Sequence, residues 1–381
     1  MPAKKPVLTV CVITYNHARY IREALDSILA QKTNFEWQVV VADDRSTDGT
    51  RDILLEYEKK FPKRVHLILQ KHNVGAEENW LDLIAYPKSK YLLYMEGDDY
   101  FVDNTKLQKQ VDFLEAHPDF SLCFHPVRVV YEDGSKEDEL FPTPEQRAHK
   151  KVLKLNDLLA YNFIQTDSVM YRWRFAAEDV KEAFPRNIIP GDWMLHLMHA
   201  ESGKIGFIDA VMAVYRRHPG SMWWQAEQNK QEFWKKYAAP HLRLYREMLK
   251  RYGDTKSSRI IIAKKISELF GIFADIDMQQ GSHLVRAAIT DDTQTAELFM
   301  ISMHEALQYS EHELHDLQRV DEYRRWALEE KDKQISQEAK QSNEQIAALR
   351  NSKSFRVGYN LLHPQGIPRR VAHRLKKTGD K

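Results

Sequence analysis

Three carboxylates follow directly on an apolar run in the stretch YLLYMEGDDYF, residues 91–101. Glu96, Asp98 and Asp99 lie within four positions, so their charges repel one another. Taking even one of them out of water is costly unless a positive charge lies beside it. Mg²⁺ and Mn²⁺ take oxygen ligands and commonly join one or two protein carboxylates to the phosphates of a substrate. The motif therefore indicates a divalent-cation site, although an Asp pair by itself also occurs in ordinary surface turns.

Three further polar segments each follow a short apolar run: TYNHARY (14–20), DDRSTDGT (43–50) and KHNVGAEEN (71–79). Asp43 or Asp44 can accept a hydrogen bond from a nucleobase N–H, and the free amides of the helix that begins after them suit an anion. Thr14, Tyr15 and Asn16 add an aromatic ring and two polar side chains. Turn and cap chemistry explains each segment alone, but four such strand ends together indicate a nucleotide-diphosphate site.

The elements that must position these residues alternate between two hydrophobic periods over the first 130 residues. Continuous apolar, β-branched runs predict buried strands at 7–13, 37–42, 65–70 and 91–95. Amphipathic stretches predict helices at 17–31, 47–61 and 77–86. This alternation is typical of an α/β fold with a Rossmann-like, mostly parallel sheet and flanking helices. In such sheets ligands bind beyond the carboxyl ends of the strands, which is where the polar segments lie.

Residues 119–220 predict a mixed α/β continuation with longer loops. FSLCFHPVRVVYE (120–132) and FIQTDSVMYRW (163–173) each predict one strand, and KIGFIDAVMAVYRRH (204–218) predicts one or two. GDWMLHLMHAESG (191–203) has the glycine signals of a capped helix, so Asp192 also fits as its N-cap.

Beyond about residue 226 the pattern is helical and shows no strand alternation. Residues 328–349 place apolar side chains at three-to-four spacing, which predicts a short coiled-coil-like helix suited to a homo-oligomer contact. The tail carries eight Lys or Arg residues against one Asp, and its SFRVGYNLL segment has an apolar side. The predicted regions are an α/β domain at 1–225, a helical region at 226–327, the coiled-coil-like helix at 328–350 and a basic amphipathic tail at 351–381.

Length and composition fit a water-soluble protein with a substantial core. The chain has 381 residues, of which 43% are hydrophobic and 29% charged. Lys plus Arg (56) nearly balances Asp plus Glu (55), so no basic excess points to nucleic acid. Cys11 and Cys123 have neither disulfide nor metal spacing, and both lie in apolar runs that predict buried reduced thiols. No signal-peptide pattern and no membrane-spanning run occurs, which predicts a cytoplasmic protein, peripheral at most on the inner face of the membrane.

The quoted motifs together resemble family 2 glycosyltransferases with the GT-A fold. The resemblance rests on VCVITYNHARYIREALDSILAQ, VVVADDRSTDGT, YLLYMEGDDYF, GDWMLHLMHAESGKIGFID and VYRRH, which keep the family's order and spacing over about residues 7–220. It implies an enzyme that moves a sugar, with inversion, from a nucleotide diphosphate sugar to a hydroxyl of a glycan or lipid-linked glycan. UDP is the nucleotide that the resemblance favours, and cell-surface polysaccharide biosynthesis is the implied setting.

By the same resemblance, EGDD is the family's metal-binding element. Asp98 is expected toward the ribose and the metal, and Asp99 as the more direct ligand of Mn²⁺ or Mg²⁺. Glu96 stands where the family more often has Asp, and it either touches the ribose or caps the strand. Asp44 corresponds to the residue that reads the nucleobase, with Tyr15 beside it, and Asp43 is a second, weaker candidate.

Asp192 corresponds to the family's general base. An acceptor hydroxyl has a pKa far above 7, so a carboxylate must take its proton as it attacks the anomeric carbon from the face opposite the leaving diphosphate. His218 corresponds to a position that supplies an imidazole to the metal or diphosphate, whereas a lone His before Pro-Gly is by default a loop residue. Arg216 and Arg217 beside it are candidate phosphate contacts or solvated side chains.

Three tryptophans are candidates for the acceptor side: Trp193, Trp223 and Trp224. The pair in GSMWWQ either stacks on a sugar ring or closes over the donor, or it anchors the helical region to the catalytic domain. The sequence leaves both readings open.

Two other functions use similar residues. A nucleotidyltransferase also places an acidic metal site on an α/β sheet, but it typically has a Gly-rich loop after the first strand, and TYNHARY contains no glycine. A degenerate transferase domain used for nucleotide-sugar binding or scaffolding would not need Asp98, Asp99 and Asp192 together. For the basic tail, the alternatives are an anionic membrane surface, a self-association contact and a solvated segment.

Overall fold

A computed structural model of the chain describes residues 6–147, 153–281, 283–290, 296 and 298–302. Two compact units result, Met1–Ile262 and Ala263–Lys381. The expected coiled-coil-like helix 328–350 and basic tail 351–381 lie outside the described residues, as does the end of the expected helical region 226–327.

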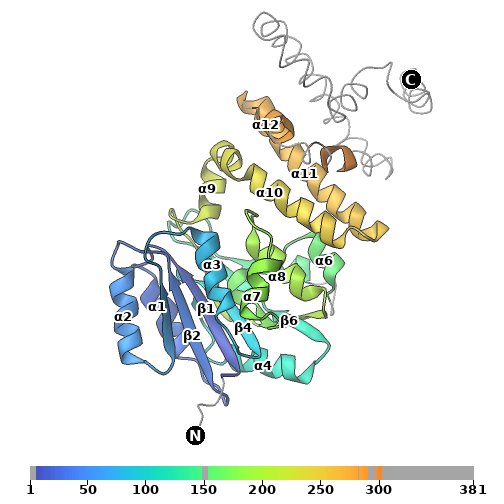
Figure 1. The fold of residues 1–381 in the computed structure, drawn as a ribbon. Coiled ribbons are helices and arrows are strands. Elements are labelled where there is room, and N and C mark those ends of the chain that lie inside the picture. Colours follow the sequence, from blue (N-terminus) through green and yellow to red (C-terminus); the bar gives the residue numbers. More distant parts are fainter. Residues whose placement is uncertain (1–5, 148–152, 282, 291–295, 297, 303–381) are drawn as a thin grey trace, which may run out of the picture. The chain divides into compact units, whose positions relative to one another are not determined.

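Seven strands form the main sheet of the first unit, in the order β10-β6-β9-β4-β1-β2-β3. Figure 1 labels β6, β4, β1 and β2 among them. Their bounds are β1 (Leu8–Thr14), β2 (Trp37–Asp43), β3 (Val65–Leu69), β4 (Tyr91–Glu96), β6 (Phe120–Phe124), β9 (Met170–Arg172) and β10 (Lys204–Phe207). All neighbours pair in parallel except β9, which is antiparallel to both β4 and β6. The expected α/β fold with a mostly parallel sheet is therefore confirmed.

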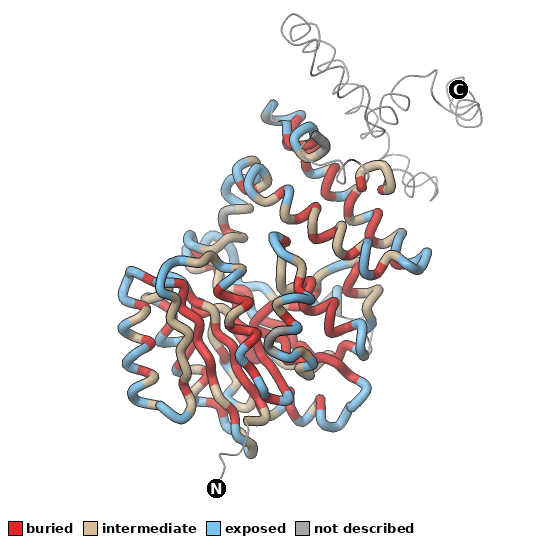
Figure 2. Tube along the Cα trace, viewed as in Figure 1, coloured by how far each residue is buried: buried red, intermediate tan, exposed pale blue. Residues whose placement is uncertain are grey.

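Helices cover both faces of this sheet. α1 (Ile21–Leu29), α2 (Thr50–Lys60) and α4 (Lys106–Ala116) share one apolar cluster with the strand residues of one face. α3 (Ala76–Ala85) packs on the other face, where the Cys11 thiol lies 3.9 Å from the Leu83 carbonyl. Burial follows the strands, and the outer helix faces are exposed (Figure 2). The apolar strand runs of the sequence are thus explained by burial on both faces.

A second, four-stranded sheet lies beside the first, in the order β5-β11-β7-β8. Its strands are β5 (Tyr100–Phe101), β7 (Val127–Tyr131), β8 (Glu139–Phe141) and β11 (Ala213–Arg217). The prediction of a single strand at 120–132 is wrong, because β6 and β7 belong to different sheets. Pro126 between them has no N–H to donate to a ladder, so the chain changes sheets there.

The predicted strand at 163–173 is also mostly wrong, since only its end pairs as β9. Residues Thr166–Ser168 form a single 3₁₀ turn, η1. The Ser168 hydroxyl donates to the Gln165 carbonyl at 2.6 Å, and such local side-chain bonds compete with strand pairing. This turn places Asp167 against the end of β4, which has consequences for the site.

The remaining helices are α5 (Pro144–Arg147), α6 (Leu155–Ala160), α7 (Ala177–Ala183), α8 (Gly191–Ala200), α9 (Met222–Gln228), α10 (Lys230–Tyr252), α11 (Lys256–Gln280) and α12 (Leu284–Thr290). α10 packs along α8, with Tyr245 edge-on to Trp193 and Arg251 paired with Glu201 at 3.0 Å. Within the described ranges, no helix is long and apolar enough to cross a bilayer.

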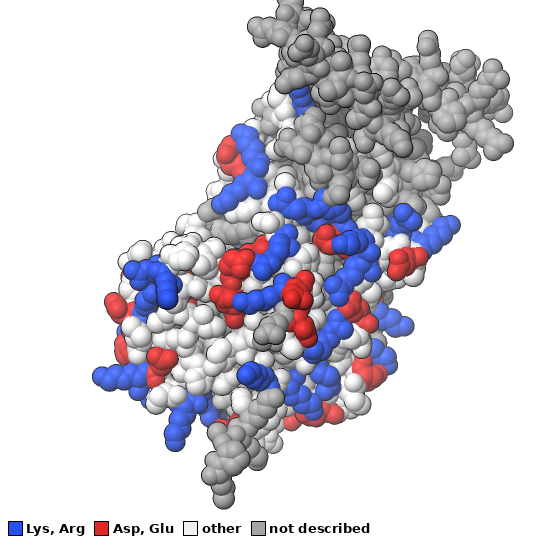
Figure 3. All heavy atoms as spheres, in the orientation of Figure 1, with Lys and Arg blue, Asp and Glu red and all other residues white. Residues whose placement is uncertain are grey.

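Charge and thiol chemistry agree with the composition. Basic and acidic side chains are interspersed over the face seen in Figure 3, as the near balance of charges predicts. Cys11 and Cys123 are buried free thiols, as expected.

Candidate active site

Strand register brings the polar strand ends to one edge of the main sheet. Thr14 at the end of β1 pairs with Asp43 at the end of β2, and Ile13 pairs with Glu96 at the end of β4. The segments that follow these strands therefore leave the sheet side by side. This is the carboxyl edge, where α/β sheets bind their ligands.

The two aspartates of EGDD are almost fully buried at this edge, with Asp98 4% and Asp99 1% exposed. Asp98 Oδ2 lies 2.9 Å from His218 Nε2, and Asp99 Oδ1 accepts the Arg216 backbone N–H at 2.8 Å. Asp98 Oδ1 and Asp99 Oδ2 are buried without a hydrogen-bond partner among the described residues. Buried polar atoms are nearly always paired, so two such orphan oxygens from adjacent carboxylates are the feature that a bound cation would satisfy.

Burial and mutual repulsion hold protons on this cluster. Burial raises the pKa of Glu96 to about 8, and the charges of Asp98 and Asp192 add to the effect. Burial also raises the pKa of Asp99 well above its usual range, followed by the charges of Asp167 and Asp98. The repulsion expected from the sequence is therefore present, and a bound cation would relieve it.

The pKa of Asp98 shifts in the opposite direction from those of Glu96 and Asp99, because two histidines lie near its carboxylate. Burial alone would raise its pKa, but the hydrogen bond from His218 and the nearby His17, 3.8 Å away, outweigh burial and lower it. The His218 Nδ1 atom meanwhile accepts the Gly220 N–H at 3.2 Å. Both ring nitrogens of His218 thus have protein partners, and the structure places this residue as the partner of Asp98.

The cluster fits a divalent cation that is shared with a substrate. Among the residues that the structure describes, no group of three or more His, Cys, Asp or Glu side chains is arranged to hold a metal by itself. Mg²⁺ and Mn²⁺ commonly use only one or two carboxylates and complete their shell with water and substrate phosphates. The orphan oxygens of Asp98 and Asp99 meet that requirement.

The two aspartates after β2 are both engaged by the protein. Arg51 pairs with Asp43 at 2.6 Å. The two oxygens of Asp44 accept the backbone N–H groups of Val74 and Gly75 at 2.7 and 3.0 Å. Asp44 therefore shapes the loop between β3 and α3.

The segment after β1 ties two loops together. Asn16 has a left-handed backbone, with φ 56°. Its N–H donates to the Ser46 hydroxyl at 2.8 Å, and its side-chain oxygen accepts the Thr47 N–H at 2.9 Å. Thr14 is buried, and none of the residues that the structure describes pairs with its hydroxyl, whereas Tyr15 is 46% exposed.

Arg216 supports the acidic motif from β11. Its Nε donates to the Asp98 carbonyl at 3.0 Å, and a terminal nitrogen pairs with Glu23 at 2.6 Å. Its guanidinium lies 4.9 Å from the Tyr20 ring and 5.0 Å from the Tyr100 ring. The structure thus places the Arg216 guanidinium against Asp98, Glu23 and two aromatic rings.

Asp192 lies at the same edge, in the first turn of α8, with 21% of its side chain exposed. Thr166 donates to its Oδ2 at 3.0 Å, and the Trp193 N–H donates to its Oδ1 at 2.7 Å. Burial raises its pKa despite these bonds. Pro190 is the N-cap of the helix, so the N-cap interpretation of Asp192 is wrong.

Two fully buried charged residues at this edge were missed by sequence reasoning, Asp167 and Lys106. Neither oxygen of Asp167 has a hydrogen-bond partner among the described residues, and burial raises its pKa to about 7, against the effect of Lys106. Lys106 Nζ donates to Gln110 at 2.7 Å and lies 4.6 Å from the Phe101 ring, and burial lowers its pKa to about 7. The sequence signal for Asp167 was an acidic residue within a run of strand-like composition. In the structure this residue lies in the turn η1 and not in a strand.

The three candidate acceptor-side tryptophans are all packed. Trp193 Nε1 donates to the Leu158 carbonyl at 2.8 Å, and Trp224 joins the main apolar cluster. Trp223 lies 5.6 Å from the Phe233 ring. Each ring therefore has a structural partner in the first unit.

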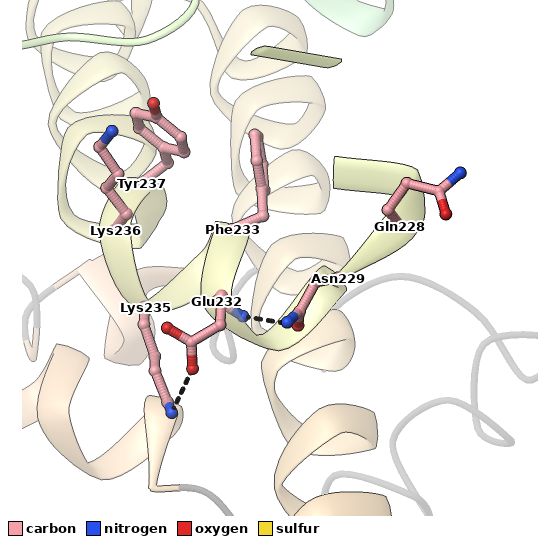
Figure 4. A pocket seen from close by; sticks show the side chains of 7 residues that line it. All are labelled: Gln228, Asn229, Glu232, Phe233, Lys235, Lys236 and Tyr237. Carbon is pink, nitrogen blue, oxygen red and sulfur yellow. Dashed lines mark hydrogen bonds and ion pairs between the residues drawn. The ribbon is translucent and has the colours of Figure 1, made fainter. Parts of the chain in front are cut away.

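Two surface cavities of the described chain lie away from the carboxylates. One of about 500 Å³, shown in Figure 4, is lined by Gln228, Asn229, Glu232, Phe233, Lys235, Lys236 and Tyr237. Its polar groups largely serve α10 itself, since Asn229 caps the helix at the Glu232 N–H and Lys235 pairs with Glu232. A second, of about 420 Å³, lies between α7 and α10. Neither cavity is lined by any of the carboxylates at the strand ends, so the strand edge remains the candidate site.

Sequence comparison identifies relatives over the same region. A family model described as Glycosyl transferase family 2 matches residues 9–249. An uncharacterized protein of Mycobacterium tuberculosis is 44% identical over 227 residues, which cover 60% of this chain and 63% of that protein. The putative teichuronic acid biosynthesis glycosyltransferase TuaG of Bacillus subtilis is 32% identical over 150 residues, 39% of this chain and 58% of the relative. The chain thus covers less than two thirds of the length of these relatives.

Structural comparison finds the same fold. Residues 1–349 of Staphylococcus aureus TarS in complex with UDP-GlcNAc match with a TM-score of 0.51 at 19% identity, over 78% of this chain and 79% of TarS. A Pyrobaculum calidifontis mannosyltransferase in complex with GDP-Man and Mn²⁺ matches with a TM-score of 0.50 at 16% identity, over 84% and 85% of the two chains. At these identities the likeness establishes the fold alone.

Proposed function

Because the chain belongs to glycosyl transferase family 2, we propose that its glycosyl transfer is metal-dependent and inverting, from a nucleotide diphosphate sugar to a hydroxyl of a glycan or lipid-linked glycan. One observation carries the proposal: at the carboxyl edge, where Asp192 also lies, Asp98 and Asp99 each have a buried oxygen with no partner in the described part of the chain. Family membership argues against the nucleotidyltransferase, and the presence of Asp98, Asp99 and Asp192 together argues against a non-catalytic domain.

Donor binding is assigned to the ends of β1, β2 and β4. Asp98 and Asp99 would hold Mn²⁺ or Mg²⁺, whose chemistry at this place is to neutralise charge on a diphosphate leaving group. His218 and Arg216 fix these two carboxylates from the second sheet. Tyr15 is the exposed ring available to a nucleobase.

Acceptor activation is assigned to Asp192. A general base works in its ionised form, and it is most effective when its pKa lies near the operating pH. Burial moves the pKa of Asp192 upward, in that direction. The rate should therefore rise with pH as this carboxyl loses its proton and fall as pH drops below its pKa. Thr166 fixes the carboxylate through Oδ2.

A panel of nucleotide sugars, screened by thermal shift with and without Mn²⁺, tests donor binding. A ligand that binds only the folded state at 100 times its Kd adds about 2.7 kcal/mol, which corresponds to roughly 5–10 °C for a domain of this size. We expect that shift with at least one UDP or GDP sugar, and only when Mn²⁺ or Mg²⁺ is present. If no nucleotide sugar stabilises the protein under either condition, the proposal is wrong.

We also propose that the basic tail 351–381 holds the enzyme at an anionic membrane surface, where a lipid-linked acceptor would lie. Basic residues near such a surface contribute about 1 kcal/mol each. The full chain should co-sediment with anionic vesicles, and a version ending at residue 350 should stay in the supernatant. Equal recovery of both versions in the supernatant would contradict membrane binding, and neutral vesicles serve as the control.

A further inference from the structure

His196 is a buried polar side chain next to Asp192, the proposed base. It lies one helical turn after Asp192 on α8 and is fully buried. Its Nε2 lies 3.9 Å from Asp192 Oδ2 and has no hydrogen-bond partner among the described residues. Its other ring nitrogen, Nδ1, lies 2.6 Å from the hydroxyl of Tyr171 on β9.

The contacts of the ring decide which nitrogen carries the proton. Burial lowers the pKa of His196 to about 3, with the Ile164 backbone opposing the shift, so the ring is neutral and has one N–H. If Nδ1 carried it, the lone pair of Nε2 would face a carboxylate, which is repulsive. If Tyr171 donates to Nδ1, the N–H is on Nε2, the ring nitrogen that lies 3.9 Å from Asp192 Oδ2.

We propose that His196 is a positioning residue for the base: Tyr171 fixes the ring with its N–H on Nε2, and this N–H stabilises the ionised carboxylate of Asp192. The inference deepens the proposed function, since it rests on Asp192 acting as the base. At 3.9 Å the contact is longer than a hydrogen bond. Catalytic hydrogen bonds are often long without substrate and tighten in the complex.

Other groups around Asp192 act in different directions. Thr166 on η1 and the Trp193 amide donate hydrogen bonds to it. Glu96 on β4 repels its charge when ionised, and Asp192 in turn helps to raise the pKa of Glu96. Tyr94 on β4 and Tyr171 on β9 stay neutral, because burial holds the pKa of each well above its usual range. The N–H of His196 is thus a favourable group that opposes the repulsion from Glu96.

The test measures the pKa of Asp192 directly, by NMR of protein labelled with ¹³C at the Asp carboxyl carbon. The resonance that disappears in Asp192→Asn assigns the group. His196→Leu removes the N–H, and the pKa of Asp192 should rise by about half to one pH unit. Tyr171→Phe should shift it the same way by less, and His196→Gln, whose amide can donate, should restore most of the wild-type value.

A second histidine of the same helix provides the matched control. His199 is equally buried, but its Nδ1 is bonded to the Leu195 carbonyl. His199→Gln should leave the pKa of Asp192 unchanged. An unchanged value in folded His196→Leu, or an equal shift in His199→Gln, overturns the inference. If His196→Leu does not fold, Tyr171→Phe and His196→Gln decide, and none of these results depends on whether Asp192 is the base.

Discussion

Replacing Asp99 with Asn is expected to abolish metal-dependent turnover while the protein stays folded. The change removes the carboxylate whose Oδ2 has no hydrogen-bond partner among the described residues, so the cation would lose a ligand and the diphosphate would lose its neutralising charge. An effect of several kcal/mol on the barrier corresponds to a rate loss of at least about 10²-fold. The measurement is a turnover assay with the donor sugar that the thermal-shift screen identifies. It follows the nucleotide released from this donor as Mn²⁺ is titrated.

Stability gives a second readout for Asp99→Asn. Because the folded-state pKa of Asp99 is raised, ionisation of this group disfavours folding, and the cost grows as pH rises above its unfolded-state pKa. The metal-free variant should therefore unfold at the same or a higher temperature than the wild type at pH 8. Asp112→Asn, an exposed change on α4, is the matched control and should alter neither turnover nor stability. Near-normal turnover of Asp99→Asn without added metal would show that the site is misassigned.

Replacing Asp192 with Asn is expected to remove transfer and spare donor binding. The base acts on the acceptor hydroxyl, and its loss typically costs about 10²–10⁴-fold in rate. Asn keeps the shape of the side chain and can still accept from Thr166, so α8 should keep its start. Turnover and the Mn²⁺-dependent thermal shift, measured on the same preparation, separate the two effects.

The pH dependence of turnover gives a further test of Asp192→Asn, because its direction is predicted. Wild-type turnover should rise with pH through a pKa above the ordinary Asp value, because burial raises the pKa of Asp192. The residual activity of Asp192→Asn should not show this rise with pH. Donor affinity that falls in proportion to turnover would instead mean that Asp192 binds the donor or supports the fold.

Much of this edge could be predicted from the sequence because it depends on local pattern. Apolar, β-branched runs identify strands buried on both faces, and parallel strands end at the same edge. Glu96, Asp98 and Asp99 therefore had to meet the polar segments after the first two strands. The repulsion within EGDD is likewise a consequence of its spacing, and it adds to burial, the larger cause, in raising the pKa values of Glu96 and Asp99.

What could not be predicted depends on segments that are distant in the chain. His218 reaches Asp98 across 120 positions, and the Arg216 amide reaches Asp99 across 117. No spacing in the sequence signals which backbone N–H groups Asp44 will accept. Such pairs are fixed by the position of β11 in the second sheet and by the loop after β3.

Asp167 and Lys106 were missed for a different reason. The run FIQTDSVMYRW has strand-like composition. The 3₁₀ turn that brings Asp167 to the acidic motif depends on a local hydrogen bond of Ser168, which composition does not indicate. A Lys at the start of an amphipathic helix is by default exposed. Its burial depends on Gln110 and the Phe101 ring, which only the packed structure brings together.

The central claim is that a divalent cation and a nucleotide sugar bind together at the sheet edge that carries Asp98, Asp99 and Asp192. Crystals grown with Mn²⁺ and the donor identified by thermal shift, with diffraction recorded at the manganese absorption edge, test this most directly. The account predicts an anomalous peak in contact with Asp98 or Asp99 and with the donor diphosphate, and the sugar between that peak and the Asp192 carboxylate. A manganese peak bound to other residues, or a diphosphate bound away from this edge, would contradict it.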